Sequence, residues 1–233
     1  MSKKRLVVLS GAGMSAESGI STFRDSGGLW EQYRIEEVAT PEAFIENPKR
    51  VLDFYNHRRK QLDEVEPNRG HQIIAELEQR FKVQVITQNV DNLHERAGST
   101  QVLHLHGELT KVRSSKHPEL IYDIGTKPIH LGDLCEKGAQ LRPHIVWFGE
   151  SVPAIDQAVP LVSKADIFLV IGTSLNVYPA AGLIRFAQTK CSKYLIDPHP
   201  VEVPFGMNFT VISKSAGEGM EQLFERLKKD YCI

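Results

Sequence analysis

The stretch from Arg5 to Arg24, RLVVLSGAGMSAESGISTFR, constrains the fold of this chain more than any other feature. Leu6 to Ser10 are apolar or small, which predicts a short buried strand that leads directly into Gly11-Ala12-Gly13. We expect Ser15 or Ser18 to cap a helical turn whose free backbone N–H groups point back at the glycines. Unpaired N–H groups and the helix dipole both favour an anion, so the turn predicts a phosphate site.

The spacing of Gly11, Gly13 and Ala16 matches the G-x-G-x-x-G/A fingerprint of dinucleotide-binding proteins, although a glycine turn of this spacing can also be purely structural. A dehydrogenase would continue with a full helix and a second strand that ends in an acidic residue about 20 residues on. Here a loop from Thr22 to Trp30 intervenes, and no strand pattern appears before Val83. The loop brings an aromatic ring, a cation and a carboxylate close to the phosphates, which suits a cofactor that is itself consumed.

Strand patterns alternate with helix patterns along the rest of the chain. Further strands are predicted at 83–87, 102–106, 144–148, 167–171, 193–196 and 209–212, and the longer helices at about 48–64, 69–81, 179–188 and 220–229. This alternation predicts an α/β fold with a Rossmann-like, doubly wound parallel sheet, whose ligands bind beyond the carboxyl ends of the strands. Five polar clusters are expected to meet at that edge: Gly11–Gly13, Gln88–Asp91, His106, Gly172–Ser174 and Asp197.

One domain over residues 1–233 is expected, with two lobes. The larger lobe would comprise about 1–25, 67–107 and 143–233, and the smaller lobe, formed by insertions, about 26–66 and 108–142. Residues 108–142 show little periodicity, so this segment is expected to be irregular.

Composition narrows the class of partner. Lys and Arg number 28 against 29 Asp and Glu, so there is no global basic field and nucleic acid is disfavoured as a partner. The apolar run near the N-terminus is too short for a signal peptide, and nothing approaches a membrane span. The 3 cysteines, Cys135, Cys191 and Cys232, are unclustered, which argues against a disulfide framework and favours a cytoplasmic protein. The oligomeric state is left open.

Five motifs resemble the sirtuins, which are NAD-dependent protein deacylases. They are, in order, GAGMSAESGISTFR, TQNVDNLHERAG, HLHGEL, LRPHIVWFGE and GTSLNVYPAAG, and the resemblance that rests on them covers nearly the whole chain. The resemblance implies that an acyl group is removed from lysine side chains of proteins while NAD⁺ is consumed. The products would be the free lysine, nicotinamide and O-acyl-ADP-ribose.

The resemblance also implies the cofactor contacts. Phe23 would cover the reacting face, and Asn89 and Asp91 would contact the nicotinamide and ribose, with Asp91 at the carboxamide; read without the resemblance, both could be helix caps. Asp197 stands where the family usually has Asn. The cofactor-binding set is Gly11, Ala12, Gly13, Ser15, Ala16, Thr22, Phe23, Arg24, Gln88, Asn89, Asp91, Gly172, Thr173, Ser174, Asp197 and Ala216.

His106 is the candidate general base, and Asn89 is the second candidate catalytic residue. An imidazole titrates near neutrality and could take a proton from a ribose hydroxyl, which then attacks the acyl carbon. His104 lies on the same strand face, so spacing does not separate the two histidines. The resemblance selects His106, which directly precedes a glycine. A histidine at a strand end can also be a satisfied core residue.

The substrate-binding residues are predicted on one helix and on two further segments of the chain. On the predicted helix, Arg58 lies in the centre of an apolar stripe that contains Tyr55. This Tyr-x-x-Arg resembles the sirtuin class that removes succinyl, malonyl or glutaryl groups, because a phenol and a guanidinium at i and i+3 can grip one carboxylate. The alternative is an internal ion pair for Arg58. The segments 146–150 and 176–178 resemble the two edges between which sirtuins hold a peptide as an added strand; the residues assigned there are Val146, Phe148, Gly149 and Val177.

The structural zinc usual in sirtuins is not expected. Ser114 and residues 115–117 replace the first cysteine pair, and Cys135 remains alone, with Gly138 in place of its mate. A makeshift site of Cys135 with His117, His130 or His144 is the less favoured alternative.

Four alternatives compete with a deacylase that removes succinyl, malonyl and acetyl groups. A nicotinamide dehydrogenase lacks support because the second strand does not follow the glycine loop. A mono-ADP-ribosyltransferase on the same fold would break the same glycosidic bond, and an acetyl-only deacetylase would not use Arg58. A non-catalytic NAD-sensing module would not need His106, Asn89 or Asp91.

Overall fold

The computed structural model of the chain describes residues 3–22 and 33–231. Its larger sheet has 6 strands in the order β3-β2-β1-β7-β8-β9, and all of its neighbouring pairs are parallel. The strands are β1 (Arg5–Ser10), β2 (Lys82–Thr87), β3 (Val102–His104), β7 (Ile167–Ile171), β8 (Ser192–Ile196) and β9 (Phe209–Ile212). Every residue of β7 is buried, and so is every residue of β1 after Arg5, as is typical of central parallel strands covered on both faces.

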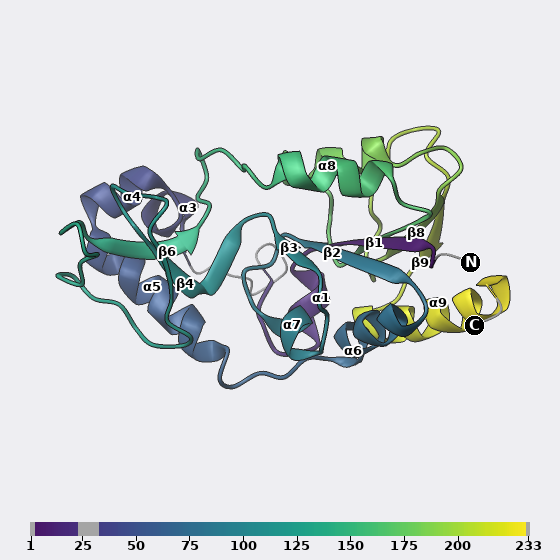
Figure 1. Cartoon of the computed structure of the whole chain (residues 1–233), viewed down its shortest axis with the longest axis horizontal. Coiled ribbons are helices and arrows are strands. Elements are labelled where there is room, and N and C mark those ends of the chain that lie inside the picture. The colour runs from purple at the N-terminus through teal and green to yellow at the C-terminus, as the bar shows by residue number, and fades with distance from the viewer. Residues whose placement is uncertain (1–2, 23–32, 232–233) are drawn as a thin grey trace.

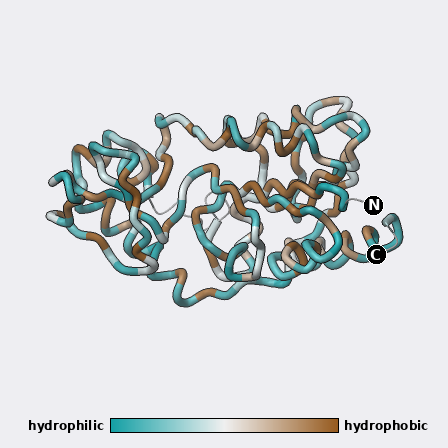
Figure 2. The backbone as a smooth tube through the Cα atoms, viewed as in Figure 1, coloured by the Kyte–Doolittle hydropathy of each residue, from teal (hydrophilic) through white to brown (hydrophobic). Residues whose placement is uncertain are grey.

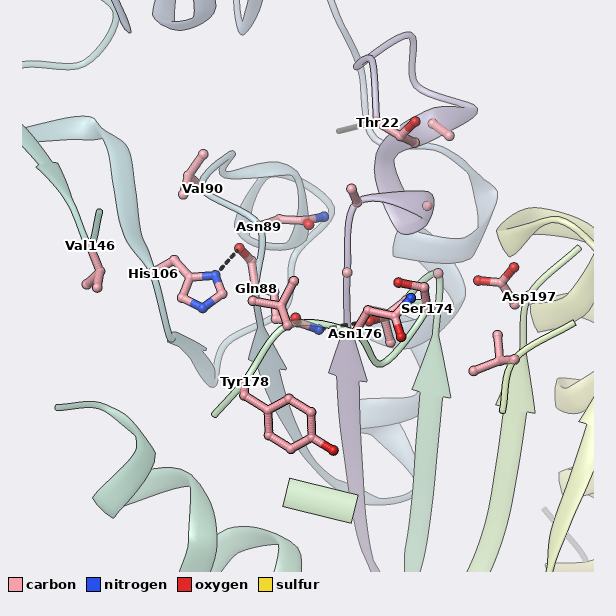
Figure 3. Close-up of a pocket in the computed structure, with 18 of the residues that line it drawn as sticks. Thr22, Gln88, Asn89, Val90, His106, Val146, Ser174, Asn176, Tyr178 and Asp197 are labelled. Atoms are coloured by element: carbon pink, nitrogen blue, oxygen red, sulfur yellow. Dashed lines mark hydrogen bonds between the residues drawn. The ribbon is translucent and has the colours of Figure 1, made fainter. Parts of the chain in front are cut away.

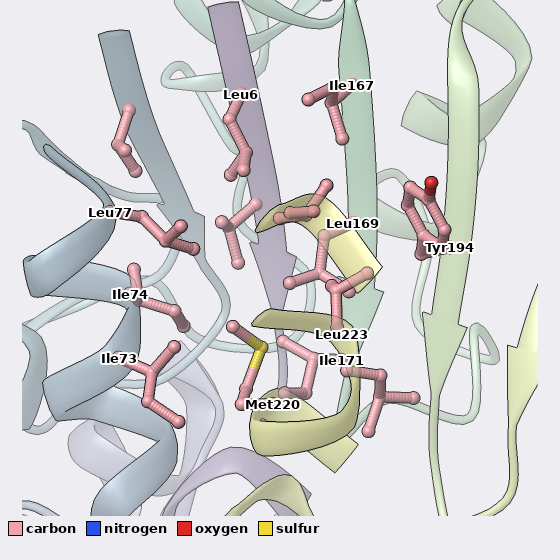
Figure 4. Close-up of a cluster of buried hydrophobic side chains, with 14 of the residues drawn as sticks. Leu6, Ile73, Ile74, Leu77, Ile167, Leu169, Ile171, Tyr194, Met220 and Leu223 are labelled. Atoms are coloured by element: carbon pink, nitrogen blue, oxygen red, sulfur yellow. The ribbon is translucent and has the colours of Figure 1, made fainter. Parts of the chain in front are cut away.

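Helices cover both faces of this sheet (Figure 1). On one face, Leu6 and Leu169 pack with Ile73 of α6 (Arg69–Glu76) and Met220 of α9 (Ala216–Tyr231) (Figure 4). On the other face, alternate strand residues such as Val7 pack with α8 (Ile155–Ser163) and the 3₁₀ helix η2 (Ala180–Phe186). Hydrophobic residues accordingly follow the strands in Figure 2. The expected Rossmann-like, doubly wound fold is confirmed.

A second, antiparallel sheet has 3 strands in the order β5-β4-β6. They are β4 (Gly107–Ser114), β5 (Ile121–Asp123) and β6 (Leu141–Ile145). Three helices pack with it through two small hydrophobic clusters, and they are α3 (Ile35–Val38), α4 (Pro41–Glu46) and α5 (Pro48–Gln61). The expectation of an irregular segment over 108–142 is therefore wrong where these strands lie, whereas residues 115–120 and 124–140 contain no helix or strand. The strands of this sheet are short or only half-buried, and β4 carries a register shift between Glu108 and Val112, so a strand periodicity is weak.

Several predicted boundaries also move. The strand expected at 144–148 is β6, which ends at Ile145, and the helix expected at 179–188 is the shorter η2. The strand expected at 102–106 stops at His104, and the helix over 69–81 divides into α6 and a 3₁₀ turn, η1 (Leu77–Gln79). A helical turn, α7 (Leu93–Arg96), precedes β3. No helix within residues 3–22 and 33–231 is long and apolar enough to cross a lipid bilayer.

Glycines allow the backbone to approach itself where the two sheets and the first loop meet. Gly107 has a φ of +81°, and a Cβ there would lie 1.9 Å from the carbonyl oxygen of His144. A Cβ on Gly13 would lie 2.8 Å from the Cα of Gly172. Neither position has room for a side chain. Glycine at residue 13 therefore lets the loop after β1 contact the loop after β7.

Candidate active site

A cavity of about 600 Å³ lies at the carboxyl ends of the parallel strands, and residues near the small sheet form its opposite wall. Figure 3 shows side chains from both sides, including His106 and Ser174, around a shared space. Nineteen of the residues predicted from the sequence line the cavity, and they are Gly11, Ala12, Gly13, Ala16, Thr22, Tyr55, Arg58, Gln88, Asn89, His106, Val146, Phe148, Gly149, Gly172, Thr173, Ser174, Val177, Asp197 and Ala216.

Four predicted residues are not in this set. Ser15 and Asp91 are buried and are not among the described residues that line the cavity. Phe23 and Arg24 fall outside the residues that the structure describes.

The glycine turn forms the floor of the cavity from backbone alone. The N–H of Gly13 donates to the carbonyl oxygen of Gly172 at 2.9 Å, and the helical turn α1 (Gly13–Ala16) follows at once. The expectation that Ser15 or Ser18 caps this turn is wrong: Ala12 occupies the N-cap position and makes no side-chain cap. The turn is held by its contact with Gly172, and its backbone lines the cavity as a candidate phosphate site.

Ser15 instead belongs to a buried hydrogen-bond network behind the cavity wall. Its hydroxyl donates to Asp91 Oδ2 at 3.0 Å and accepts from Asn89 Nδ2 at 3.1 Å. Asp91 Oδ1 also accepts from the N–H of Leu93 at 3.1 Å, where α7 begins. Burial raises the pKa of the Asp91 carboxyl. Asp91 thus binds the first N–H of α7 and orients Ser15, while Asn89 lines the cavity.

His106 and His104 have different surroundings. His106 Nδ1 lies 3.0 Å from the carbonyl oxygen of Gln88 (Figure 3). A carbonyl only accepts, so Nδ1 carries the proton and Nε2 keeps a lone pair. Burial lowers the pKa of His106, which keeps the imidazole neutral at physiological pH. This combination is suited to a general base.

His104 is not among the described residues that line the cavity. Its Nδ1 lies 3.1 Å from the carbonyl oxygen of Asn89, and its Nε2 lies 2.7 Å from Glu95 Oε1. Burial opposes the charge on His104, but the hydrogen bond and charge of Glu95 outweigh it and raise the pKa. His104 therefore ties the loop after β2 to α7.

Tyr55 and Arg58 reach the cavity from α5. Both side chains are buried, with only 3% and 7% of their residue surfaces exposed. Burial lowers the pKa of Arg58, while the neighbouring Tyr55 and Asp91 act in the opposite direction. Burial also raises the pKa of Tyr55 to about 12, so the phenol stays protonated.

Arg59, the next residue, was not recognised from the sequence as a buried cation. It is 0% exposed, and its Nε donates to the carbonyl oxygen of Leu109 at 2.6 Å. Its Nη1 donates to Asn56 Oδ1 at 2.7 Å. Arg59 therefore ties α5 to the small sheet, and only Arg58 of this pair faces the cavity.

Sequence reasoning also missed residues at the far end of the cavity from His106. Glu17, His199 and Ser215 line it beside Asp197 and Ala216. Glu17 Oε2 accepts from the N–H of Gly217 at 2.6 Å, and Glu17 Oε1 accepts from Ser215 Oγ at 2.9 Å. Glu17 lies within the first motif but caps a helix about 200 residues away, a pairing that local patterns do not signal.

Cys135 forms no metal cluster with other described residues. Its thiol donates to Ser114 Oγ at 3.3 Å, and the residues that the structure describes contain no group of three or more His, Cys, Asp or Glu side chains able to hold a metal ion.

The fold and the cavity define a nucleotide-binding α/β protein with a second, antiparallel sheet beside the cavity. The Sir2 family model matches residues 11–179, and the chain belongs to this family. A protein of Bacteroides thetaiotaomicron named NAD-dependent protein deacylase is 58% identical over 229 residues, which cover 96% of this chain and 98% of that protein. A Helicobacter pylori protein of the same name is 54% identical over 224 residues, covering 96% and 95%.

Solved structures agree with this assignment. A Sir2 homologue mutant in complex with ADP-ribose superposes with a TM-score of 0.90 at 40% identity, covering 99% of this chain and 94% of that chain. A Sir2 homologue in complex with NAD gives a TM-score of 0.87 at 41% identity, covering 98% and 91%.

Proposed function

We propose that this chain is an NAD-dependent protein-lysine deacylase that removes succinyl and malonyl groups and also acetyl groups. The products are the free lysine, nicotinamide and O-acyl-ADP-ribose. The relatives with 54–58% identity, which cover almost all of the chain, carry the name NAD-dependent protein deacylase. The chain acts on acylated lysine side chains of proteins, and we propose that it does so in the cytoplasm.

The preference for acidic acyl groups rests on one observation: Tyr55 and Arg58 line the same cavity as His106. A phenol and a guanidinium are both hydrogen-bond donors, and a guanidinium favours a carboxylate as its acceptor. A succinyl or malonyl carboxylate entering the cavity would accept hydrogen bonds from both side chains. An acetyl group cannot, although the cavity still admits it.

The cofactor side of the cavity fits NAD⁺. The glycine turn and Gly172 supply a backbone surface without side chains for the pyrophosphate, and Gln88 Nε2 fixes Thr173 by donating to its Oγ1 at 3.1 Å. Asn89 lies beside His106 along the cavity wall, which is where we place the nicotinamide ribose. Phe23 and Arg24 remain proposed contacts that lie outside the described residues.

The reaction needs a base, and water must be kept from the ribose carbon until the acyl oxygen has attacked it. The acyl-lysine carbonyl oxygen would attack that carbon and displace nicotinamide, and His106 Nε2 would accept the proton of a ribose hydroxyl whose oxygen attacks the acyl carbon. One water would then add at the acyl carbon, and its C–N bond to lysine would break, which releases the lysine amine and leaves the acyl group on ADP-ribose. His106 is held ready for the proton transfer because Gln88 fixes its Nδ1 proton. The half-exposed Phe148, with Val146 and Val177, lines the entrance where we place the peptide.

We further propose that the chain works as two lobes. The larger lobe comprises about 1–25, 67–107 and 143–233, and the smaller one, about 26–66 and 108–142, supplies Tyr55 and Arg58.

A panel of lysine peptides carrying acetyl, malonyl, succinyl and glutaryl groups tests this function. With NAD⁺, mass spectrometry should detect deacylated peptide, nicotinamide and O-acyl-ADP-ribose in equal amounts, and most rapidly for an acidic acyl group. Labelled protein with no deacylated peptide would instead indicate a mono-ADP-ribosyltransferase. Turnover of the acetyl peptide alone would refute the assigned acyl class but leave the deacylase.

A further inference from the structure

Trp147 packs with Leu109 and Ile145 of the small sheet and also lines the cavity that contains the proposed acyl site. It follows β6, and only 2% of its surface is exposed. Its indole Nε1–H donates to the hydroxyl oxygen of Tyr55 at 3.0 Å. The two rings are tilted and lie 6.3 Å apart between centroids, so the hydrogen bond, and not stacking, is their direct contact.

This hydrogen bond determines which further hydrogen bond the Tyr55 hydroxyl can form. A phenol has one proton to donate, and its oxygen can accept. Trp147 uses the oxygen as an acceptor, and within residues 3–22 and 33–231 the hydroxyl makes no other hydrogen bond. The Tyr55 proton is thus left for an acceptor that enters the cavity. The raised pKa of Tyr55 supports this reading, because a neutral phenol keeps that proton.

Trp147 is itself fixed on two further sides. The guanidinium carbon of Arg142 lies 3.3 Å from the centroid of its ring, and the backbone N–H of Trp147 donates to Glu150 Oε2 at 2.8 Å. Arg142 closes the arrangement by donating from Nη1 to Glu150 Oε1 at 2.7 Å. An indole held at its face and its backbone has little freedom to turn, so its N–H keeps one direction.

We propose that Trp147 is a specificity-determining residue for acidic acyl groups, because its indole N–H directs the Tyr55 hydroxyl proton towards the acyl carboxylate. The inference rests on the proposed function and deepens it. Trp147 acts through Tyr55 and is therefore a positioning residue, with Arg142 and Glu150 holding its ring in place. A phenylalanine here would retain an aromatic face for Arg142 but would remove the N–H that orients Tyr55.

Three variants test the proposal: Trp147→Phe, Tyr55→Phe and the double variant. For a succinyl-lysine peptide, Tyr55→Phe should raise KM about tenfold, and Trp147→Phe severalfold, with kcat little changed in both. The double variant should be no worse than Tyr55→Phe alone, since both changes remove the same contact. The KM for the acetyl peptide should change less. If the increases in KM of the two single variants multiplied in the double variant, the proposal would be overturned. Equal increases for the succinyl and acetyl peptides would also overturn it.

Phe44→Leu is the matched packing control. The Phe44 ring lies 5.4 Å from that of Trp147 between centroids but has no polar atom, so it can loosen the indole without removing its hydrogen bond. The succinyl-to-acetyl ratio of kcat/KM should survive Phe44→Leu, even if the melting temperature falls. If Phe44→Leu lowered the ratio as much as Trp147→Phe, packing would explain the effect and the proposal would fail. A wild-type enzyme without any succinyl preference would instead refute the proposed acyl class itself.

Discussion

His106 and His104 lie two residues apart but have different chemical environments. His106 lines the cavity, and no described residue forms a hydrogen bond with its Nε2, whereas both ring nitrogens of His104 lie near acceptors, the Asn89 carbonyl and the Glu95 carboxylate. Both His104 nitrogens therefore carry protons in this arrangement. We therefore propose His106 as the base, whereas His104 holds the loop on which Asn89 lies.

His106→Ala should lower the rate of deacylation by about 10² to 10⁴ while NAD⁺ binding persists, because loss of a general base typically has this effect. Single-turnover kinetics and calorimetric titration with NAD⁺ measure the two properties separately. His104→Ala, the matched variant, should have a smaller effect on the rate. A comparable loss in His104→Ala together with an active His106→Ala would reverse the assignment.

Two other histidines should make the free energy of unfolding depend on pH. His71 and His94 are buried with ring centroids 4.8 Å apart, and burial lowers the pKa of His71 to about 4 and that of His94 well below its ordinary value. Unfolded histidines titrate near 6.5, so below that pH the unfolded chain binds protons that the folded chain does not. The free energy of unfolding should therefore fall as the pH drops below 6.5, by about 1.4 kcal/mol per pH unit for each histidine.

Urea unfolding at a series of pH values measures this slope. His71→Leu should flatten it between pH 6.5 and about 4, because one of the two buried histidines no longer titrates. An unchanged slope in His71→Leu would show that other groups cause the acid instability.

Arg58 and Arg59 show the limit of prediction at single residues. Periodicity places Arg58 on the apolar stripe of its helix, but it does not tell whether the stripe faces the core or a cavity. Arg59 is even more buried, and its partners, Leu109 and Asn56, come from β4 and from its own helix. Which of two adjacent cations meets a ligand depends on tertiary contacts that no local pattern contains.

At the scale of elements, the buried parallel strands could be predicted, and the antiparallel sheet could not. Leu6 to Leu9 and Ile167 to Ile171 are continuous apolar runs, because helices cover both faces of the sheet. In β4, buried and half-buried residues alternate around a register shift, and β5 has only 3 residues. The small sheet is therefore specified by partners distant in sequence, and its strands resemble loops when read alone.

The small sheet should hold its shape without a metal ion. Where the family usually has zinc cysteines, Ser114 and Cys135 are buried and share a hydrogen bond. Purified protein should contain well under one zinc per chain by elemental analysis, and a chelator should leave the melting temperature and the activity unchanged. Stoichiometric zinc, or a melting temperature that falls with the chelator, would contradict this prediction.

At the scale of the whole molecule, one cavity joins residues from both sheets. The motifs after β1, β2, β7 and β8 could be predicted to meet, because parallel strands share one carboxyl edge. The positions of Glu17 and Trp147 could not, since each depends on a contact between segments about 90 to 200 residues apart. The combination of a cofactor edge with a buried arginine across the cavity is what gives the molecule its proposed specificity.

Arg58→Met tests that claim most directly, through the ratio of kcat/KM for succinyl-lysine to that for acetyl-lysine in one peptide. Hydrogen bonds to charged groups are worth about 1.5–3 kcal/mol, so the wild-type ratio should be roughly tenfold to a hundredfold, mainly through KM. Arg59→Lys, at the neighbouring buried cation, should leave the ratio unchanged. We predict that Arg58→Met abolishes the succinyl preference and spares or improves deacetylation. Equal loss of both activities in Arg58→Met would make Arg58 a structural residue and contradict the account.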